Sequence, residues 1–483
     1  MDRLELSGLY AHDDSLSTTT TEQRIAKEKP GSGSHERQSR NIPIAAHLEG
    51  ISESEKITFE NVTVLWRLNY KVEKTVATSE KLKKIIPDEE QVSVKILGHV
   101  PILYEKSIFD VPNLKNLDLS NVGLEKIEPG AFGNLPLLED LLLYGNNLTE
   151  IKTATFTNLN VSQVVLLSNS ITLLEPGVFR NLKAVSVSLD NNKLTEFSSD
   201  VFENVTLGIL GLALNRLHTI APGALSAIGL TELNLFSNNF EEIDPQIFDM
   251  QELVSLDLDS NSIKLLRPGD LRNLPELKEL WLVENQLEEI PEGVFNNTKL
   301  TKLDLSNNQI AKIASKAFED IRELTLLRLD FNKITDWDNN WLSEAKSISE
   351  ISISYNLITE IPDEVLKNYS NVTRIDFRGN KIRKISAQAF YKLQHIDHLN
   401  LAYNEIDNWN PDLLGNVSIV SLDLRGNRLK CIKGDLETIF RNVQIVYLDK
   451  NPWEEECAKK IVEFQQKKKI DILVGLLPTK PIL

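Results

Sequence analysis

Cysteine is scarce in this sequence, with only Cys431 and Cys457 among 483 residues. Two thiols are too few for a disulfide-rich scaffold or a zinc ribbon. Long apolar runs are missing as well, because no stretch reaches the roughly 18–20 residues that a membrane-spanning helix requires. The opening MDRLELSGLYAHDDSLSTTTTEQ lacks the apolar core of a signal peptide, and the ending LVGLLPTKPIL is too short for a lipid-anchor signal. We therefore expect no membrane span.

Positive charge is also in deficit, since 53 lysines and arginines stand against 70 aspartates and glutamates, which gives a net charge of -17. Binding to nucleic-acid phosphates needs a basic stripe, so this balance argues against nucleic acid, and equally against an anionic membrane surface, as a partner. No G-x-S-x-G, P-loop or G-x-G-x-x-G motif occurs, and no other catalytic constellation is visible. The sequence predicts neither an enzyme nor a cofactor.

What the sequence does contain is an internal repeat. A single core rarely grows beyond roughly 250–300 residues, so a chain of 483 residues needs several domains or a repeat array. The template LxxLxLxxNxL fits Leu138, Leu141, Leu143, Asn146 and Leu148 without a gap. Its ninth position then recurs every 23 or 24 residues as asparagine, at Asn169, Asn192, Asn215, Asn238, Asn261, Asn285, Asn308, Asn332, Asn356, Asn380, Asn404, Asn427 and Asn451.

The residue types explain the pattern. Positions four and six point inward from a short strand and stack on their equivalents in neighbouring coils, so the strands form a parallel sheet about 4.8 Å apart. Buried turns leave backbone groups that must be paired, and an asparagine side chain, which both donates and accepts, can tie one coil to the next. A phenylalanine ten positions later fills the convex side, at Phe156, Phe179, Phe202, Phe248, Phe295, Phe318 and Phe390.

The unit LxxLxLxxNxLxxIxxxxFxxLxx, as in LKNLDLSNVGLEKIEPGAFGNLPL, resembles the "typical" subclass of leucine-rich repeats over about residues 91–452. The resemblance implies an α/β-type solenoid, a leucine-rich-repeat horseshoe with a parallel concave sheet and an irregular or short-helical convex side. The sequence is similar to the arthropod group that includes Toll-type receptor ectodomains and secreted leucine-rich immune proteins of mosquitoes. We predict a disordered segment at 1–50, an N-terminal cap with a degenerate first repeat at 51–113, the array at 114–452, and a C-terminal cap and tail at 453–483.

The segment LKCIKGDLETIFRNVQIVYLDKNPWEEEC resembles the C-terminal cap of that group, which typically carries NPWxCxC. Trp453 and Cys457 are kept, but Glu455 replaces the first cysteine of the pair. Cys431 and Cys457 fall at similar positions of consecutive coils, about 5–7 Å apart at Cα and within disulfide range. We predict a Cys431–Cys457 bridge; two buried free thiols in a reducing compartment are the alternative.

The outward strand positions five and seven form the concave face, where we expect a partner to bind. The candidate residues are Leu142, Tyr144, Val165, Leu167, Phe236, Asp257, Asp259, Trp281, Val283, Arg328, Asp376 and Arg378. Exposed aromatic clusters commonly anchor protein interfaces; cover by the N-terminal segment or by a glycan, or no role, are the alternatives. The aspartates fit a basic partner or a cation, but a solvated face is the simpler interpretation. Arg374, Arg378 and Arg425 offer Asp376 and Asp423 opposite charge.

Three further features have a structural interpretation that is simpler than the functional one. His395, Asp397 and His398 are spaced unlike a zinc site, so we expect a surface pair and no metal. Trp337 and Trp409 stand where other repeats carry Ile or Leu, so we expect core residues. Eight N-x-S/T sequons are a mild excess over chance and matter only if the chain is secreted, at Asn61, Asn147, Asn160, Asn204, Asn296, Asn368, Asn371 and Asn416.

Three functions stay open at this point. The first is a secreted or cell-surface recognition protein, in immunity or adhesion, that binds a protein or glycan ligand; the repeat subclass, the cap and the sequons favour it. The second is a cytoplasmic scaffold or adaptor, favoured by the absent signal peptide and the polar start. The third is the ectodomain part of a signalling receptor. A homo- or hetero-dimer is compatible with each, and nothing in the sequence selects one.

Overall fold

The computed structural model describes residues 56–68, 71–88, 91–366, 371–390 and 393–468. The predicted disordered segment 1–50 lies outside these residues. All described elements belong to one compact unit, Glu55–Leu483. Within the described part of the chain, no helix combines the length and the apolar character needed to cross a bilayer.

One sheet of 18 strands runs through this unit. Its strands pair in the order β2-β1-β3-β6-β9-β12-β15-β18-β20-β21-β22-β24-β26-β27-β29-β31-β32-β33. Their bounds are β1 Phe59–Leu68, β2 Lys71–Ser79, β3 Val92–Leu97, β6 Leu114–Asp118, β9 Asp140–Leu142, β12 Asn160–Val165, β15 Lys183–Ser188, β18 Thr206–Gly211, β20 Glu232–Asn234, β21 Ser255–Asp257, β22 Glu279–Trp281, β24 Lys302–Asp304, β26 Leu326–Arg328, β27 Glu350–Ser352, β29 Arg374–Asp376, β31 His395–Asn400, β32 Ser418–Asp423 and β33 Val443–Tyr447.

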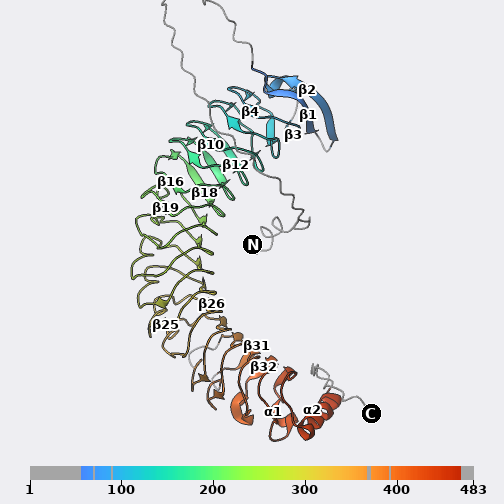
Figure 1. Cartoon of the computed structure of the whole chain (residues 1–483), viewed down its shortest axis with the longest axis vertical. Helices are drawn as coiled ribbons and strands as arrows, with labels where there is room; N and C mark the ends of the chain where they lie inside the picture. Colours follow the sequence, from blue (N-terminus) through green and yellow to red (C-terminus); the bar gives the residue numbers. More distant parts are fainter. Residues whose placement is uncertain (1–55, 69–70, 89–90, 367–370, 391–392, 469–483) are drawn as a thin grey trace, which may run out of the picture. The chain divides into compact units, whose positions relative to one another are not determined.

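From β3 onward every pairing in this sheet is parallel and joins equivalent positions of successive coils. Leu210 pairs with Leu233, and Leu233 with Leu256, each at position four of its repeat. These leucines are buried, as predicted, because the strand turns every second side chain to the coil interior. Figure 1 shows the sheet along the inner side of the arc that the coils trace. Positions three, five and seven therefore face the concave side of the arc.

The first coil is covered by an antiparallel hairpin. β1 pairs with β2 on one side and with β3 on the other, both antiparallel. Phe59, Val62 and Val64 of β1 are fully buried. The hairpin therefore shields the leucine interior of the array from water at its N-terminal end (Figure 1).

The convex side is irregular through most of the array. It consists of turns and two-residue strands that pair between coils: β4 Ile102–Leu103, β5 Ile108–Phe109, β7 Lys126–Ile127, β8 Phe132–Gly133, β10 Glu150–Ile151, β11 Phe156–Thr157, β13 Leu173–Leu174, β14 Phe179–Arg180, β16 Glu196–Phe197, β17 Phe202–Glu203, β19 Thr219–Ile220, β23 Glu289–Ile290, β25 Lys312–Ile313, β28 Glu360–Ile361 and β30 Lys384–Ile385. The described helical segments are η2 Leu82–Lys84, η3 Pro411–Leu414, α1 Leu436–Ile439 and α2 Glu455–Lys468.

Phenylalanines stack beneath this convex side, as predicted. The ring centroids of Phe156 and Phe179 lie 5.3 Å apart, and those of Phe179 and Phe202 lie 5.4 Å apart. Trp409 is buried and Trp337 packs against the core, so both are core residues. The recurrent aromatic ring thus links each coil to its neighbours, which is how a repeat too small for its own core becomes stable.

The asparagines form the expected ladder between coils. Asn238 donates from Nδ2 to the carbonyl of Leu212 (2.9 Å) in the preceding coil and to that of Leu235 (3.1 Å) in its own. Its Oδ1 accepts from the backbone N–H of Leu217 (2.9 Å). The same pattern recurs up to Asn451. Each side chain therefore pairs three backbone groups that water cannot reach.

A second ladder runs along the convex side and was not predicted. Asn204 donates to Asn181 (2.8 Å), and Asn181 donates to Asn158 (2.9 Å). One coil further toward the N-terminus, Asn134 donates to Asp110 (2.6 Å). All five residues have a positive φ between 49° and 58°, a conformation that Asn and Asp adopt at low cost. The recurrent F-x-N in FGN, FTN, FRN and FEN is the sequence signal for it.

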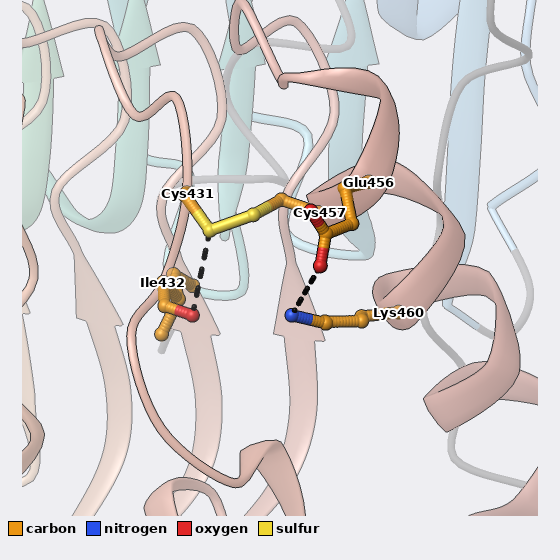
Figure 2. The surroundings of a disulfide bond; sticks show 5 residues. All are labelled: Cys431, Ile432, Glu456, Cys457 and Lys460. Carbon is orange, nitrogen blue, oxygen red and sulfur yellow. Dashed lines mark hydrogen bonds and ion pairs between the residues drawn. A yellow bond between two sulfur atoms is a disulfide. The ribbon is translucent and has the colours of Figure 1, made fainter.

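A disulfide closes the C-terminal end of the array. Cys431, in the last full coil, is bonded to Cys457 in the first turn of α2, with 5.3 Å between their Cα atoms. Figure 2 shows the bond joining the coil to the helix, beside the ion pair of Glu456 and Lys460 (3.1 Å). The predicted pairing is confirmed. Closing a loop of 26 residues is worth about 3 kcal/mol in the chain-entropy view.

Replacing Asn238 by Ala tests the ladder. The variant leaves the buried N–H of Leu217 without an acceptor and removes one of the two asparagine donors from each of the Leu212 and Leu235 carbonyls. We therefore expect a loss of about 2–3 kcal/mol in the free energy of unfolding, measured by urea denaturation. Because each coil contacts only its neighbours, the unfolding curve should also broaden. Asn239→Ala is the matched control, since Asn239 is exposed and only approaches the carbonyl of Arg216 at 3.4 Å. Equal losses in the two variants would argue against the ladder.

Candidate recognition surface

The twelve candidate residues all lie on the concave side of the main sheet or in the turn that follows its strands. The parallel register places Val165 of β12 beside Leu142 of β9, and Tyr144 and Leu167 follow two positions later. Asp257 of β21 pairs with Trp281 of β22. The structure therefore brings together an N-terminal apolar group and a central aspartate–tryptophan group. Arg328, Asp376 and Arg378 belong to coils nearer the C-terminus.

The apolar candidates are only half-exposed. Leu142, Tyr144, Val165, Leu167, Phe236, Trp281 and Val283 are all of intermediate exposure. Leu142 and Val165 stand side by side on paired strands, at the strand spacing of about 4.8 Å. The surface is a row of partly shielded apolar side chains.

The aspartates of this face are structural, which corrects the expectation of a solvated acidic face. Asp259, Asp304 and Asp423 are only 6%, 4% and 7% exposed. The carboxylate of Asp304 accepts from the backbone N–H of Ser306 two residues on (3.0 Å). That of Asp259 accepts from the N–H of Val283 in the next coil (2.7 Å). The carboxylates thus pair strand-end N–H groups, so they cannot all serve a ligand.

Burial changes the titration of several of these carboxylates. It raises the pKa of Asp190 above its ordinary value, although hydrogen bonds from the Ser188 hydroxyl and the Ala213 N–H act in the opposite direction. Burial raises the pKa of Asp304 and Asp376 as well. Asp118 behaves differently: burial opposes ionisation there too, but hydrogen bonds from Lys95 and from Ser120 outweigh it and lower the pKa.

Arginines and aspartates meet in the coils nearest the C-terminus. Arg425 donates from Nε and Nη2 to Asp423, with a shortest distance of 2.5 Å, so that expected pair forms. Asp376 is instead held by the Arg378 N–H (2.8 Å) and by Asn400 (3.0 Å). A hollow of about 520 Å³ opens here, lined by Arg328, Glu350, Ile351, Ser352, Arg374, Ile375, Asp376, His398, Leu399, Asn400, Ser421, Asp423, Arg425 and Tyr447.

A row of aromatic residues beside this hollow was missed from sequence. Phe331, Tyr355 and Tyr403 occupy position eight of their repeats, directly before the ladder asparagine, and are 50%, 37% and 37% exposed. Each has a positive φ, between 52° and 56°. Most other repeats place Asn, Ser or Gly at this position, and a bulky side chain there costs about 1–2 kcal/mol. Leu214, Glu284 and Lys450 adopt the same conformation at this position, so the three rings differ from them by forming an aromatic surface.

Two glycines make room for the tyrosine rings. Gly379 and Gly426 stand at position eight of the coils after Tyr355 and Tyr403. A Cβ atom at Gly379 would lie 2.6 Å from the Tyr355 ring, and one at Gly426 would lie 2.7 Å from the Tyr403 ring. Each ring therefore lies flat over the next coil instead of pointing into solvent.

The histidines behave as the expected surface pair. Nε2 of His395 lies 2.9 Å from Oδ1 of Asp397, both exposed, while His398 lines the hollow. Within the residues that the structure describes, no three His, Cys, Asp or Glu side chains are arranged to hold a metal ion.

The sequon asparagines are accessible where the structure describes them. Asn61, Asn147, Asn160, Asn204, Asn296, Asn371 and Asn416 are exposed, and Asn368 lies outside the described residues. Asn204 also donates within the convex ladder. Its use of one Nδ2 hydrogen leaves the other available, so a glycan at this position is compatible with the ladder.

Coils of 23–24 residues, a parallel inner sheet and an asparagine ladder define a leucine-rich-repeat horseshoe. Two family models agree with this assignment. The BspA type leucine rich repeat region matches residues 288–413 in six copies, and the leucine rich repeat matches residues 112–169 and 228–287. The chain is therefore a leucine-rich-repeat protein. No curated protein gives a significant sequence match.

Solved structures with this fold come from bacteria and from insects. A leucine-rich-repeat protein of Leptospira interrogans is 24% identical, with 76% of this chain and 96% of that one covered at a TM-score of 0.56. Drosophila Toll, in its complex with Spatzle, is 19% identical, with 72% and 52% covered at a TM-score of 0.57. An internalin of Listeria monocytogenes is 24% identical, with 61% and 82% covered at 0.50. The expected likeness to a Toll-type ectodomain is thus confirmed for the fold.

Replacing Asp190 by Asn tests the buried carboxylates. Because the native pKa is raised, the folded protein holds a proton more tightly than the unfolded chain. This contribution is present at acid pH and is lost as the pH rises through the native pKa. We therefore expect the free energy of unfolding of the wild type to fall relative to that of Asp190→Asn as the pH rises above about 4. Urea titrations at several pH values measure the difference.

Asp118→Asn is the matched control of opposite sign. The lowered pKa of Asp118 contributes stability at neutral pH that is lost as the pH falls through the native pKa. Relative to this variant, the wild type should lose stability only below about pH 4. The same pH dependence in both comparisons would contradict the assigned shifts.

Proposed function

We propose that this protein is a non-enzymatic recognition module whose concave face binds a protein partner. The observation that carries the proposal is the chemistry of the outward strand positions. Tyr144, Phe236 and Trp281 stand half-exposed on the concave side of the sheet, outside the hydrophobic core. Aromatic side chains of this kind are the usual anchors of protein interfaces.

The relatives in fold are consistent with this role. Toll is seen in a complex with Spatzle, so one solenoid of this fold holds a protein partner. The concave sheet of the present chain is rigid, because its strands are fixed by backbone pairing and by the ladder. A preformed surface loses little conformational entropy on binding, which favours recognition over catalysis as the role of this scaffold.

We further propose that the protein acts outside the cell or at its surface, in immunity or adhesion. The Cys431–Cys457 bridge supports this location, because disulfides persist in oxidising compartments. The exposed sequon asparagines support it as well, since a glycan at each of them would project into solvent. A cytoplasmic scaffold and the ectodomain part of a receptor are the competing assignments.

Mass analysis of the native protein tests the location. We expect a non-reducing digest to contain the peptide pair joined by Cys431 and Cys457, and glycan removal to lower the mass of peptides that carry Asn147 or Asn204. A protein with two free thiols and unmodified sequons would instead support the cytoplasmic scaffold. An Asn147→Gln variant that keeps the same glycan mass on its peptide would show that this site is unused.

Replacing Tyr144 and Trp281 by Ala tests the concave face. We expect the affinity for a partner isolated with the full chain to fall at least about tenfold, because aromatic anchors dominate interface energetics. The thermal midpoint should move little, since both side chains lie outside the core. Isothermal titration and thermal unfolding measure the two effects.

Leu173→Ala with Leu265→Ala is the matched control. Both leucines are exposed apolar residues, and Leu173 belongs to the convex strand β13. This variant should bind the partner as the wild type does. If binding survives the loss of Tyr144 and Trp281, or if the convex control weakens it equally, the concave face is the wrong surface.

A further inference from the structure

The row of aromatic side chains near the C-terminal end forms one continuous surface with an arginine. We call Phe331, Tyr355, Arg378 and Tyr403 the aromatic ridge. The rings of Phe331 and Tyr355 stack with centroids 4.4 Å apart and an interplanar angle of 10°. The Arg378 guanidinium lies 5.4 Å from the centroid of Tyr355 and 5.1 Å from that of Tyr403. The arginine is therefore held between two tyrosines.

The three aromatic residues of the ridge adopt a backbone conformation that is unfavourable for large side chains. Its three rings stand on residues with positive φ, and Gly379 and Gly426 leave the space that the tyrosine rings occupy. No buried core group needs these rings, because Phe331, Tyr355 and Tyr403 are all exposed. Strained residues that persist on a surface point to a role outside the fold.

Positive charge accompanies the ridge and is rare elsewhere on the concave face. Positions three, five and seven carry no arginine in the coils from Asn146 to Asn308, but four in the coils that follow, at Arg328, Arg374, Arg378 and Arg425. Lys450 also donates to the Tyr403 hydroxyl (2.7 Å). In a chain of net charge -17, this concentration of arginine is local.

The cations at this place are more exposed than the anions. The Arg425 side chain is 38% exposed, whereas those of Asp423 and Asp449 are 11% and 15% exposed. Asp330 is engaged by the Ser354 N–H (2.6 Å) and by the Ser352 hydroxyl (2.5 Å). Asp330 therefore faces the backbone, whereas Asp423 pairs with Arg425, and Glu350 pairs with Arg328 (3.0 Å) and Arg374 (3.7 Å). In each of these pairs the arginine side chain is the more exposed partner.

Arg378 has donor capacity left over. Its guanidinium stacks on two rings, and its Nε is buried without a hydrogen-bond partner among the described residues. Guanidinium groups pair with carboxylates in a planar, two-bonded geometry. An incoming carboxylate beside the rings would pair with the Nη groups, because the buried Nε is out of its reach.

We propose that the aromatic ridge and the arginine-lined hollow beside it form the docking site for an acidic polypeptide segment of the partner. The proposal rests on the proposed function and names the chemistry of its ligand. Spaced carboxylates reach Arg374, Arg378 and Arg425, and apolar side chains between them contact the rings. A sulfated polysaccharide fits less well, because its charge on every unit would meet Glu350, Asp376 and Asp423 between the arginines.

A random peptide display library, selected on the immobilised full-length protein, tests the ligand chemistry. We expect the selected peptides to be enriched in Asp and Glu and to contain apolar residues between them. Their affinity should fall as salt is raised, because exposed charge pairs are screened. Selection of basic peptides, or of none, would overturn the proposal. If heparin binds at the ridge without displacing the selected peptides, the assignment of a polypeptide ligand to the ridge is wrong.

The triple variant Phe331→Asn, Tyr355→Asn, Tyr403→Asn tests the position of the site. Asparagine already stands at the equivalent Asn121, Asn191 and Asn307, each with positive φ, so the coils should fold. We expect the selected peptides to bind at least about tenfold more weakly, and Arg378→Gln to reduce both the affinity and its salt dependence. The convex Leu173→Ala, Leu265→Ala variant should bind as the wild type does.

Failure of this inference can be told apart from failure of the proposed function. If the peptides bind the triple variant unchanged but lose affinity for Tyr144→Ala, Trp281→Ala, the concave face recognises protein and the ridge is not its site. If neither concave variant changes binding, both proposals fall. Circular dichroism of each variant shows that loss of binding does not reflect loss of the fold.

Discussion

Every coil of this solenoid turns inward after its strand, and the backbone groups of that turn are shielded from water. The asparagine ladder pairs these backbone groups. Asn238 pairs two carbonyls and one N–H across two coils, and its equivalents repeat the arrangement up to Asn451. Without those bonds, each coil would bury several unpaired backbone groups at a cost that its few leucines could not offset. The stacking of leucines and phenylalanines depends on this condition, since coils that do not dock tightly cannot exclude water.

The need to pair backbone groups also applies at the surface of the concave sheet. Strand ends also leave N–H groups that need acceptors, and the aspartates at positions five and seven supply them. Asp304 does so within its own coil, and Asp259 does so in the next. The acidic residues of this face therefore belong to the fold, and burial raises the pKa of Asp304. In the proposed function, side chains such as Trp281 and Arg378 distinguish one ligand from another.

The sequence predicts the parts of this structure that repeat. Leucines, ladder asparagines and convex phenylalanines recur at fixed spacing, and the Cys431–Cys457 pairing follows from the positions of both residues in consecutive coils. The burial of Asp259 was not predictable, because an outward position does not reveal that its carboxylate bends back to the N–H of Val283. The rings of Phe331 and Tyr355 were missed for a related reason: position eight is a turn position, and only the backbone shows that their stacked rings lie along the sheet.

Fold alone does not separate the relatives of this chain, since a bacterial leucine-rich-repeat protein and Drosophila Toll share it at similar TM-scores. What separates them is the set of side chains that stacking leaves unconstrained. In this chain those side chains divide the concave face in three: an N-terminal apolar stretch with Leu142 and Val165, a central stretch with Trp281 and structural aspartates, and a C-terminal stretch with tyrosines and arginines. The positive φ at position eight links the asparagine ladder inside the solenoid to the side chains on its surface. The turn that the ladder requires forces this conformation on every coil, and in three coils the chain keeps a large ring there although asparagine would be easier. The turn conformation that the ladder requires is therefore also found where the surface of this chain differs from the repeat pattern.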